Sequence, residues 1–364
     1  MHIAYDAKRA FLNRSGLGNY SRTLLKNICR YQSGHSLHLL TPEAKLTADT
    51  DFLFHEPTVH IHSGISVINR LYPSPAFFNT HKIDIYHGLS NELPFNAAKL
   101  NIKKVVTIHD VIFMRYPQWY NAIDRAIYTW KTRRACEAAG TIIAISRQTK
   151  NDLIEFLKVP EQKIKVVYQS CDEAYTRETA APVTSVLLPE KYLLYVGTIE
   201  PRKNLMSIAK ALKVLKNKIQ IPLLVIGKST PYKKQVQQYL QNHGITDRMI
   251  FAENIPLEQM PAIYRGASVF IYPSTFEGFG IPIIEALYSR VPVITGTGSC
   301  FSEAGGADSC YINPESNFQL AESIEQIVNS STLSLQMVNE GYNYVQRFNA
   351  ENTSKELMRV YSSM

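Results

Sequence analysis

The stretch from Val269 to Leu287 carries the strongest structural signal in this chain of 364 residues. It begins with an apolar run of β-branched and aromatic residues, 269–272, which is typical of a buried strand. A loop over 275–280 follows, and Pro282 stands where the first residue of a helix is expected. Ligands of α/β sheets bind where strands end and helices begin, so the sequence predicts a ligand site here.

Two acids and two glycines in this stretch have the chemistry to bind a sugar or a ribose. Gly278 and Gly280 let backbone N–H groups approach a ligand closely. Glu277 is expected in the loop and Glu285 in the first helical turn, so their carboxylates would accept hydrogen bonds from separate hydroxyls of one ligand. Taken alone, each glutamate is better explained structurally, Glu277 as a turn acid and Glu285 as an acid that favours a helix N-terminus. The complete stretch from Val269 to Leu287 favours a ligand site.

A second strand-to-helix turn carries two adjacent cations. A strand is predicted over 192–196, followed by Gly197 and by a helix that ends near Lys216. Arg202 and Lys203 lie between them, and together with a helix N-terminus they make an anion site that needs no metal ion. A solvated pair of surface cations is the simpler alternative. The expected position at the ligand edge of a sheet favours the anion site.

Short apolar strands alternate with helices through both halves of the chain. This pattern predicts the α/β class, with two mostly parallel, doubly wound, Rossmann-like domains that face each other across a cleft. Residues 172–190 show no hydrophobic period of a helix or a strand and are interpreted as a linker. The domains are therefore expected at 1–171 and 190–348. Within 41–80 we expect one strand, Val59–His62, and little regular structure after it.

Two predicted strands of the first half lead into a histidine at the expected ligand edge. The strand over 83–87 ends in His87, and the strand over 103–108 precedes His109. A lone histidine is more often structural than catalytic, but the carboxyl ends of parallel strands are the ligand side. Both histidines are therefore candidate ligand contacts.

A glycine-bearing loop over 13–18 follows the first predicted strand and precedes a helix expected over 19–31. Gly16 and Gly18 allow backbone N–H groups to bind a phosphate there, although the third glycine of a dinucleotide fingerprint is missing. Ser146 also follows a predicted strand. We interpret it as the N-cap of the next helix rather than as a ligand contact.

The formal charge of +8 and the pI of about 9.1 suit an anionic partner, such as a nucleotide sugar or a lipid head group. No nucleic-acid-binding motif is present. The five cysteines include no C-x-x-C pair, which indicates reduced thiols and argues against a zinc site. Basic residues near Trp130 are expected to face solvent or a membrane surface. Without an apolar run typical of a signal peptide, we expect a cytoplasmic protein, peripheral to the membrane at most.

Three strings in the sequence resemble the signatures of one enzyme family. EGFGIPIIEAL resembles the signature of the retaining, nucleotide-sugar-dependent glycosyltransferases of family 4, which have the two-domain GT-B fold. VGTIEPRKNL is similar to the second signature of that family. TIHDVIFMRYP is similar to its H-D segment, most of all in mannosyltransferase-like members.

The resemblance implies a role for each matching residue of the first signature. Glu277 would lie beside the donor sugar, where it positions the sugar rather than acting as a nucleophile. Glu285 would hold the ribose of the nucleotide. The backbone amides of Phe279 and Gly280 would contact the donor hexose.

The other two strings supply the remaining implied site residues. Arg202 and Lys203 would clamp the diphosphate of the donor, and His109 would meet the donor sugar. The resemblance therefore favours His109, with Asp110 as a supporting acid, and leaves His87 as a weaker candidate. The remaining implied donor-binding residues are Gly16, Gly18, Gly197 and, beside the nucleobase, Ile255.

The implied reaction is the transfer of a hexose, with mannose favoured, from a nucleotide-diphosphate sugar to a hydroxyl of a glycan or lipid-linked acceptor. Such a retaining hexosyltransferase would serve polysaccharide or lipopolysaccharide synthesis. No metal and no cofactor are expected, and GDP-mannose is favoured over UDP-sugars as the donor. The first domain would bind the acceptor through loops 41–80 and 111–130. The last helix, 349–364, would cross back to that domain.

Three alternatives share parts of this pattern. A nucleotide-sugar 2-epimerase has the same architecture but would release a free product without an acceptor. A non-catalytic nucleotide-sugar-binding subunit would bind the donor without transfer, although the intact signatures argue against it. A two-lobed binding protein of the periplasmic type is disfavoured by the expected lack of a signal peptide.

Overall fold

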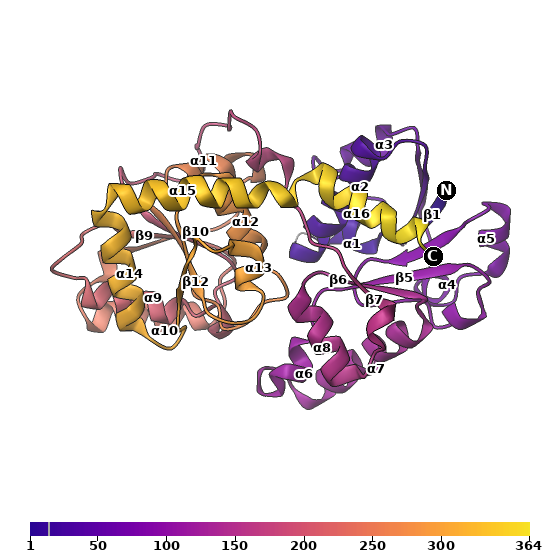
Figure 1. Ribbon diagram of the computed structural model, residues 1–364, viewed down its shortest axis with the longest axis horizontal. Coiled ribbons are helices and arrows are strands. Elements are labelled where there is room, and N and C mark those ends of the chain that lie inside the picture. The colour runs from indigo at the N-terminus through magenta and orange to yellow at the C-terminus, as the bar shows by residue number, and fades with distance from the viewer. Residues whose placement is uncertain (14) are drawn as a thin grey trace. The chain divides into compact units, whose positions relative to one another are not determined.

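The structure, a computed structural model, describes residues 1–13 and 15–364, so one position of the expected glycine loop, Arg14, lies outside it. The chain divides into two compact units (Figure 1). The first unit consists of residues 1–170 together with 348–364, and the second consists of residues 171–347. Residues 172–190, which were interpreted as a linker, therefore belong to the second unit.

The first unit is built on a seven-stranded parallel sheet with the order β3-β2-β1-β4-β5-β6-β7. The order changes direction between β1 and β4, which creates the switch point where open sheets of this kind bind ligands. The strands are β1 (His2–Asp6), β2 (Ser36–Leu40), β3 (Val59–His62), β4 (Ile85–Gly88), β5 (Lys103–Ile108), β6 (Thr141–Ala144) and β7 (Ile164–Val166).

Helices cover both faces of this sheet, so its strands are buried on both sides. Alternate residues of β1 show this, because Ile3 and Tyr5 pack with Leu25 and Leu357 on one face while Ala4 packs on the other. The helices are α1 (Lys8–Leu12), α2 (Gly16–Tyr31), α3 (Asp51–His55), α4 (Val67–Leu71), α5 (Pro75–Thr80), α6 (Ile112–Arg115), α7 (Ala122–Ala138), α8 (Arg147–Leu157) and α16 (Ala350–Ser362).

The second unit contains a six-stranded parallel sheet with the order β10-β9-β8-β11-β12-β13, and its switch point lies between β8 and β11. The strands are β8 (Leu193–Val196), β9 (Leu223–Ile226), β10 (Met249–Ala252), β11 (Val269–Tyr272), β12 (Val293–Gly296) and β13 (Cys310–Ile312). The helices are α9 (Leu205–Val214), α10 (Tyr232–Asn242), α11 (Met260–Arg265), α12 (Ile281–Tyr288), α13 (Phe301–Gly305), α14 (Asn317–Asn329) and α15 (Ser331–Val345).

The last helix, α16, packs against α2 within the first unit (yellow beside indigo in Figure 1). Its Tyr361 is fully buried, and the phenol oxygen lies 2.6 Å from Nδ1 of His87. This contact fixes the end of the chain to the sheet of the first unit. In the part of the chain that the structure describes, no helix has both the length and the apolar character needed to cross a membrane.

The prediction for residues 41–80 was right for β3 and wrong for the segment after it. Two short helices, α4 and α5, form there because serine caps supply hydrogen-bond acceptors for their first N–H groups. Ser66 Oγ accepts from the backbone N–H of Asn69, and Ser74 Oγ accepts from that of Ala76. The cap predicted at Ser146 is confirmed, because its Oγ accepts from the N–H of Thr149.

Helix α2 begins at Gly16 rather than at the predicted residue 19, so Gly16 and Gly18 lie in its first turn and not in a loop. Gly18 has a packing reason to be glycine. A Cβ at this position would lie 1.8 Å from the carbonyl oxygen of Asn13, which no side chain can tolerate. A phosphate contact by either glycine stays a prediction.

Candidate functional site

The residues predicted to bind a sugar diphosphate in the second unit lie on two turns that are neighbours in space. One turn follows β8 and contains the short 3-10 helix Pro201–Lys203, and the other follows β11. The two strands pair in parallel, so their carboxyl ends meet at the same edge of the sheet. A backbone hydrogen bond of 3.0 Å from the N–H of Thr275 to the carbonyl of Arg202 links the turns directly.

Glu277 forms ion pairs with both predicted cations. Its Oε1 lies 2.6 Å from Nζ of Lys203, and its Oε2 lies 3.0 Å from Nη1 of Arg202. The three side chains are 11%, 12% and 20% exposed, respectively, so water screens these pairs only weakly. We call these three residues the ionic cluster. Arg202 also pairs with the more exposed Glu200, at 2.7 Å.

The charges of the ionic cluster depend on one another. Burial on its own would raise the pKa of Glu277, but Lys203 and Arg202 outweigh this effect and lower it to about 2. Burial would lower the pKa of Arg202, and its carboxylate neighbours Glu277 and Glu200 raise it instead. The carboxylate of Glu277 is therefore ionised at neutral pH and acts as an acceptor of hydrogen bonds, not as an acid.

Further hydrogen bonds fix the two cations in place. Lys203 Nζ donates to the hydroxyl of Tyr272, the last residue of β11, at 2.6 Å. Arg202 Nη1 donates to the carbonyl of Phe276 at 2.8 Å. Both cationic groups are thus oriented before any ligand arrives, and such preorganisation is what an anion site requires.

Glu285 lies outside the ionic cluster, in the second turn of α12. Its predicted place in the first turn was wrong, because Gly280 at φ +109° forms the N-cap and the helix begins at Ile281. Burial raises the pKa of Glu285 to about 7, while hydrogen bonds from Tyr264 and Tyr175 act in the opposite direction. The hydroxyl of Tyr264 donates to Oε2 at 2.8 Å.

The other predicted donor-binding positions of the second unit lie on loops that follow strands. Gly280 adopts a backbone conformation that favours glycine, and Gly197 directly follows β8. Phe279 is buried, and its carbonyl accepts a hydrogen bond from the thiol of Cys300. Ile255 is half-buried in the loop after β10. Their contacts with a donor stay predictions.

His109 lies in the first unit, and both of its ring nitrogens have hydrogen-bond partners. Nε2 donates to the carbonyl of Leu89 at 2.8 Å, so Nδ1 is the nitrogen that accepts from the side-chain amide of Gln169 at 3.2 Å. Burial lowers the pKa of His109 to about 4, although the hydrogen bond to Leu89 opposes this shift. The imidazole is therefore neutral and fixed in one tautomer.

The neighbouring candidates in the first unit also have structural partners. His87 is fully buried, and its two nitrogens lie 2.6 Å from the hydroxyl of Tyr361 and 2.8 Å from that of Thr107. The Asp110 carboxylate accepts from the backbone N–H of Ile112 at 3.1 Å, which helps to begin α6. Both ring nitrogens of His87 are thus used within the fold, and a ligand contact by this residue stays a prediction.

Sequence reasoning missed three side chains that complete the site in the second unit. Tyr272 and Glu200 hold the two cations, and Tyr264 holds Glu285. Tyr272 had a usable signal, because the last residue of a buried strand lies at the ligand edge of the sheet. Nothing in the local sequence around Tyr264 indicated its contact with α12.

Two protein families match successive parts of the chain. The family described as Glycosyltransferase Family 4 matches residues 14–175, and the family described as Glycosyl transferases group 1 matches residues 177–344. A characterised relative is the O-antigen chain mannosyltransferase B of Escherichia coli. It is 25% identical over an alignment 375 residues long, and the alignment covers 95% of this chain and 96% of the relative.

Solved structures share the fold over the whole chain. The sucrose-phosphate synthase of Thermosynechococcus elongatus has a TM-score of 0.77 at 18% identity, with 100% of this chain and 98% of that chain covered. HepE of Anabaena, solved in complex with UDP and glucose, has a TM-score of 0.74 at 16% identity, with 100% of both chains covered. With both family matches and this fold, the chain belongs to family 4 of the glycosyltransferases and has the GT-B fold.

Proposed function

We propose that the protein is a retaining mannosyltransferase that transfers mannose from a nucleotide-diphosphate sugar to a hydroxyl of a glycan or lipid-linked acceptor in polysaccharide synthesis. The observation that carries this proposal is the ionic cluster at the carboxyl ends of β8 and β11. It combines two oriented cations with one ionised carboxylate on a sheet edge of the kind that binds nucleotides.

Arg202 and Lys203 would bind the diphosphate and stabilise the negative charge that develops on it as the sugar departs. Oriented donors of this kind give one of the largest contributions to enzymatic rates. In the absence of donor, Glu277 neutralises part of their charge. Donor phosphates would therefore share or take over hydrogen bonds that the carboxylate holds. We propose that this site binds the diphosphate without a metal ion.

Glu277 would position the sugar and stabilise the positive charge that develops at the anomeric carbon. Because its pKa is about 2, it stays ionised throughout the reaction. In a retaining transfer the oxygen of the leaving phosphate can accept the proton of the acceptor hydroxyl on the same face of the sugar. No separate protein base is then needed.

GDP-mannose is the proposed donor, in preference to UDP-sugars. The relative from Escherichia coli supports mannose, because its name describes a mannosyltransferase of the O-antigen chain and it aligns over nearly the whole chain. The proposed acceptor is a growing glycan or a lipid-linked oligosaccharide.

Helix α7 of the first unit has a surface suited to a lipid-linked acceptor. Ile123 and Trp130, seven residues apart on one face of the helix, are 73% and 50% exposed, and Arg134 is exposed one turn later on the same face. Arg125 and Arg133 are exposed on other sides of the helix. Exposed apolar and basic side chains on one helix favour contact with an anionic lipid surface. We propose that the protein rests on such a surface when it binds its acceptor. Sedimentation with vesicles of anionic and of zwitterionic phospholipid tests this, and equal sedimentation with both would contradict it.

Product analysis tests the proposed reaction. The purified protein is incubated with GDP-mannose or UDP-glucose and with extracted membrane lipids, and products are followed by NMR and mass spectrometry. We expect GDP release together with an α-linked mannosyl product, in the presence and absence of EDTA. A free epimerised sugar would identify a 2-epimerase instead, and donor binding with neither transfer nor hydrolysis would identify a binding subunit.

A further inference from the structure

Five of the ten histidines in the chain gather on the edge of the sheet in the first unit. His38 of β2 pairs directly with His60 of β3, so both side chains lie on the same face of the sheet. His62 follows two residues later on that face, and His2 lies on it in β1. The fifth, His81, is the C-cap residue that directly follows α5.

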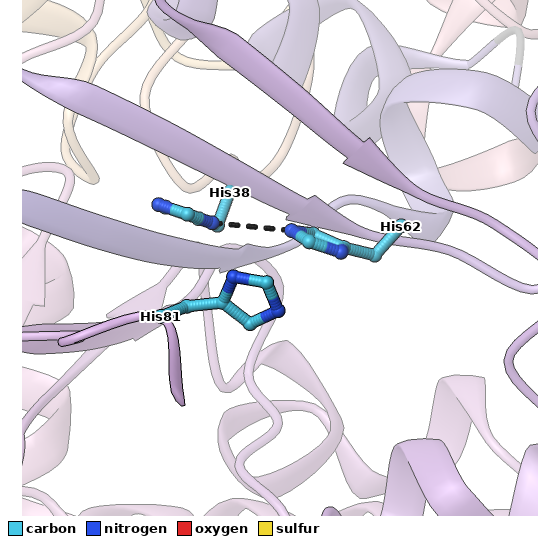
Figure 2. A group of neighbouring side chains, drawn as sticks. All are labelled: His38, His62 and His81. Carbon is cyan, nitrogen blue, oxygen red and sulfur yellow. Dashed lines mark hydrogen bonds between the residues drawn. The ribbon is translucent and has the colours of Figure 1, made fainter. Parts of the chain in front are cut away.

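Three of these imidazoles have the spacing of metal ligands. Figure 2 shows the rings of His38, His62 and His81 lying together, with the ring of His81 directed toward the other two. Nδ1 of His38 lies 3.1 Å from Nε2 of His62, and one ring nitrogen from each of the three residues lies within 4.8 Å of the others. With Zn–N distances of about 2.0–2.1 Å, tetrahedral ligands lie roughly 3.4 Å apart, so small side-chain movements suffice.

The surroundings hold these rings in place and favour the neutral form of His38 and His62. His38 is only 4% exposed, and Phe77 packs against His62 and His81 with ring centroids 4.9 and 4.6 Å apart. Burial and the neighbouring imidazoles lower the pKa of His38 to about 4 and also lower that of His62. A neutral imidazole is the form that ligates a metal ion.

We propose that His38, His62 and His81 form a binding site for a divalent transition-metal ion, with Zn²⁺ as the preferred ion and water as the fourth ligand. Three imidazole nitrogens suit Zn²⁺, Cu²⁺ and Ni²⁺, whereas Mg²⁺ and Ca²⁺ require oxygen ligands. The expectation that the chain has no zinc site considered only its cysteines. This histidine site belongs to a different unit from the ionic cluster and supplies no group to the proposed transfer of the sugar.

The metal ion would cross-link three elements that are far apart in the sequence. His38 belongs to β2, His62 to the edge strand β3, and His81 to the end of α5. In the sequence, His38 and His81 flank residues 41–80, which are predicted to help select the acceptor, and His62 lies within that segment. Binding would therefore stabilise the edge of the first unit, because an ion that binds only the folded state adds to stability.

Metal titration of the protein without a histidine tag tests the proposal. We expect one Zn²⁺ per chain by mass spectrometry after dialysis, a rise in melting temperature that EDTA reverses, and the visible absorption bands of tetrahedral Co²⁺ after substitution. His62→Gln and His81→Gln should each weaken Zn²⁺ binding by at least about tenfold. His55→Gln should leave it unchanged, because His55 is an exposed histidine on α3, outside the group.

Circular dichroism of the metal-free variants shows whether they fold. His62 and His81 are both half-buried, but His62 lies in a strand of the sheet and His81 directly follows a helix, so His81→Gln is the variant least expected to disturb the core. The proposal would be overturned by less than one bound ion in the folded wild-type protein. It would equally be overturned if His81→Gln bound Zn²⁺ as tightly as His55→Gln, since binding would then reflect adventitious surface histidines only.

Discussion

The two sheets of this protein present different chemistry at their ligand edges. In the second unit, charged side chains face one another, with Arg202 and Lys203 on either side of Glu277. In the first unit, the corresponding polar groups are His87 and His109, which are neutral and hydrogen-bonded through both nitrogens. The difference indicates that the charge available for the proposed transfer lies in the second unit. Substitutions in the ionic cluster should change the rate, whereas substitution of the fully buried His87 should change stability. Contact of His109 with the donor sugar stays a prediction.

The largest expected effect is the loss of one cation from the ionic cluster. Lys203→Ala should lower turnover by roughly 10²–10³, the usual cost of removing one oriented donor to a developing anion. The fold should survive, because Arg202 still pairs with Glu277. Release of GDP from GDP-mannose measures the effect. Lys218→Ala, which removes a lysine from a surface ion pair of the same unit, should retain full activity.

Removal of the Glu277 carboxylate should have opposite effects on GDP binding and on turnover. Glu277→Gln keeps the shape of the side chain but removes the negative charge shared by both cations, so GDP should bind more tightly than to the wild-type protein. Turnover should nevertheless fall by about 100-fold, because the charge beside the sugar is lost. Calorimetry with GDP and steady-state kinetics with GDP-mannose measure the two effects. Weaker GDP binding by a folded variant would contradict the idea that the carboxylate competes with phosphate.

Acidification should destabilise the first unit before the second. The pKa of His109 falls from 6.5 to about 4 on folding, so the unfolded chain binds more protons and stability declines as the pH drops from 6.5 toward 4. For Glu277 the pKa falls from 4.5 to about 2, so its contribution declines only as the pH drops from 4.5 toward 2. Each contribution amounts to roughly 3 kcal/mol.

The tryptophans make this order measurable. Both of them, Trp119 and Trp130, belong to the first unit, so tryptophan fluorescence in urea reports on that unit. Protection from hydrogen exchange, resolved by mass spectrometry, reports on peptides of both units. If peptides of the second unit lost their protection from exchange before those of the first, between pH 6.5 and 4.5, the predicted order of acid destabilisation would be wrong.

The smallest effect concerns a serine at the ligand edge of the first unit. Ser146→Ala removes the cap of α8, where Oγ accepts from the N–H of Thr149 at 3.0 Å. We expect a loss of about 1 kcal/mol in the free energy of unfolding and no change in turnover. Urea denaturation and the GDP-release assay measure the two quantities. A large loss of turnover at unchanged stability would make Ser146 a ligand contact instead of a cap.

Regular patterns made much of the fold predictable from the sequence. The strands Val59–His62 and Lys103–Ile108 have the predicted bounds, and helix α8 begins at Arg147, directly after the predicted cap at Ser146. Helix α10 was not predicted, since only Val236 and Leu240 of its 11 residues are buried. Helix α4 was missed for a similar reason, because it contributes no buried residue and shows no amphipathic period.

The site was only partly predictable, because its contacts depend on strand order. The sequence indicated that Arg202, Lys203 and Glu277 lie at strand ends, but their ion pairs arise from the adjacency of β8 and β11. The histidine group has no sequence motif either. Only the register of β2 against β3 places His38 opposite His60.

The measurement that tests the central claim most directly is calorimetry with nucleoside diphosphates and monophosphates, on the wild-type protein and on Lys203→Met. Comparing the affinity for GDP with that for GMP, and the affinity for UDP with that for UMP, isolates the contribution of the second phosphate to binding. The comparison holds whichever base the enzyme prefers. If the ionic cluster holds the diphosphate, the wild-type protein should bind the diphosphates much more tightly, and Lys203→Met should lose most of that preference. An unchanged preference in the folded variant would contradict the account.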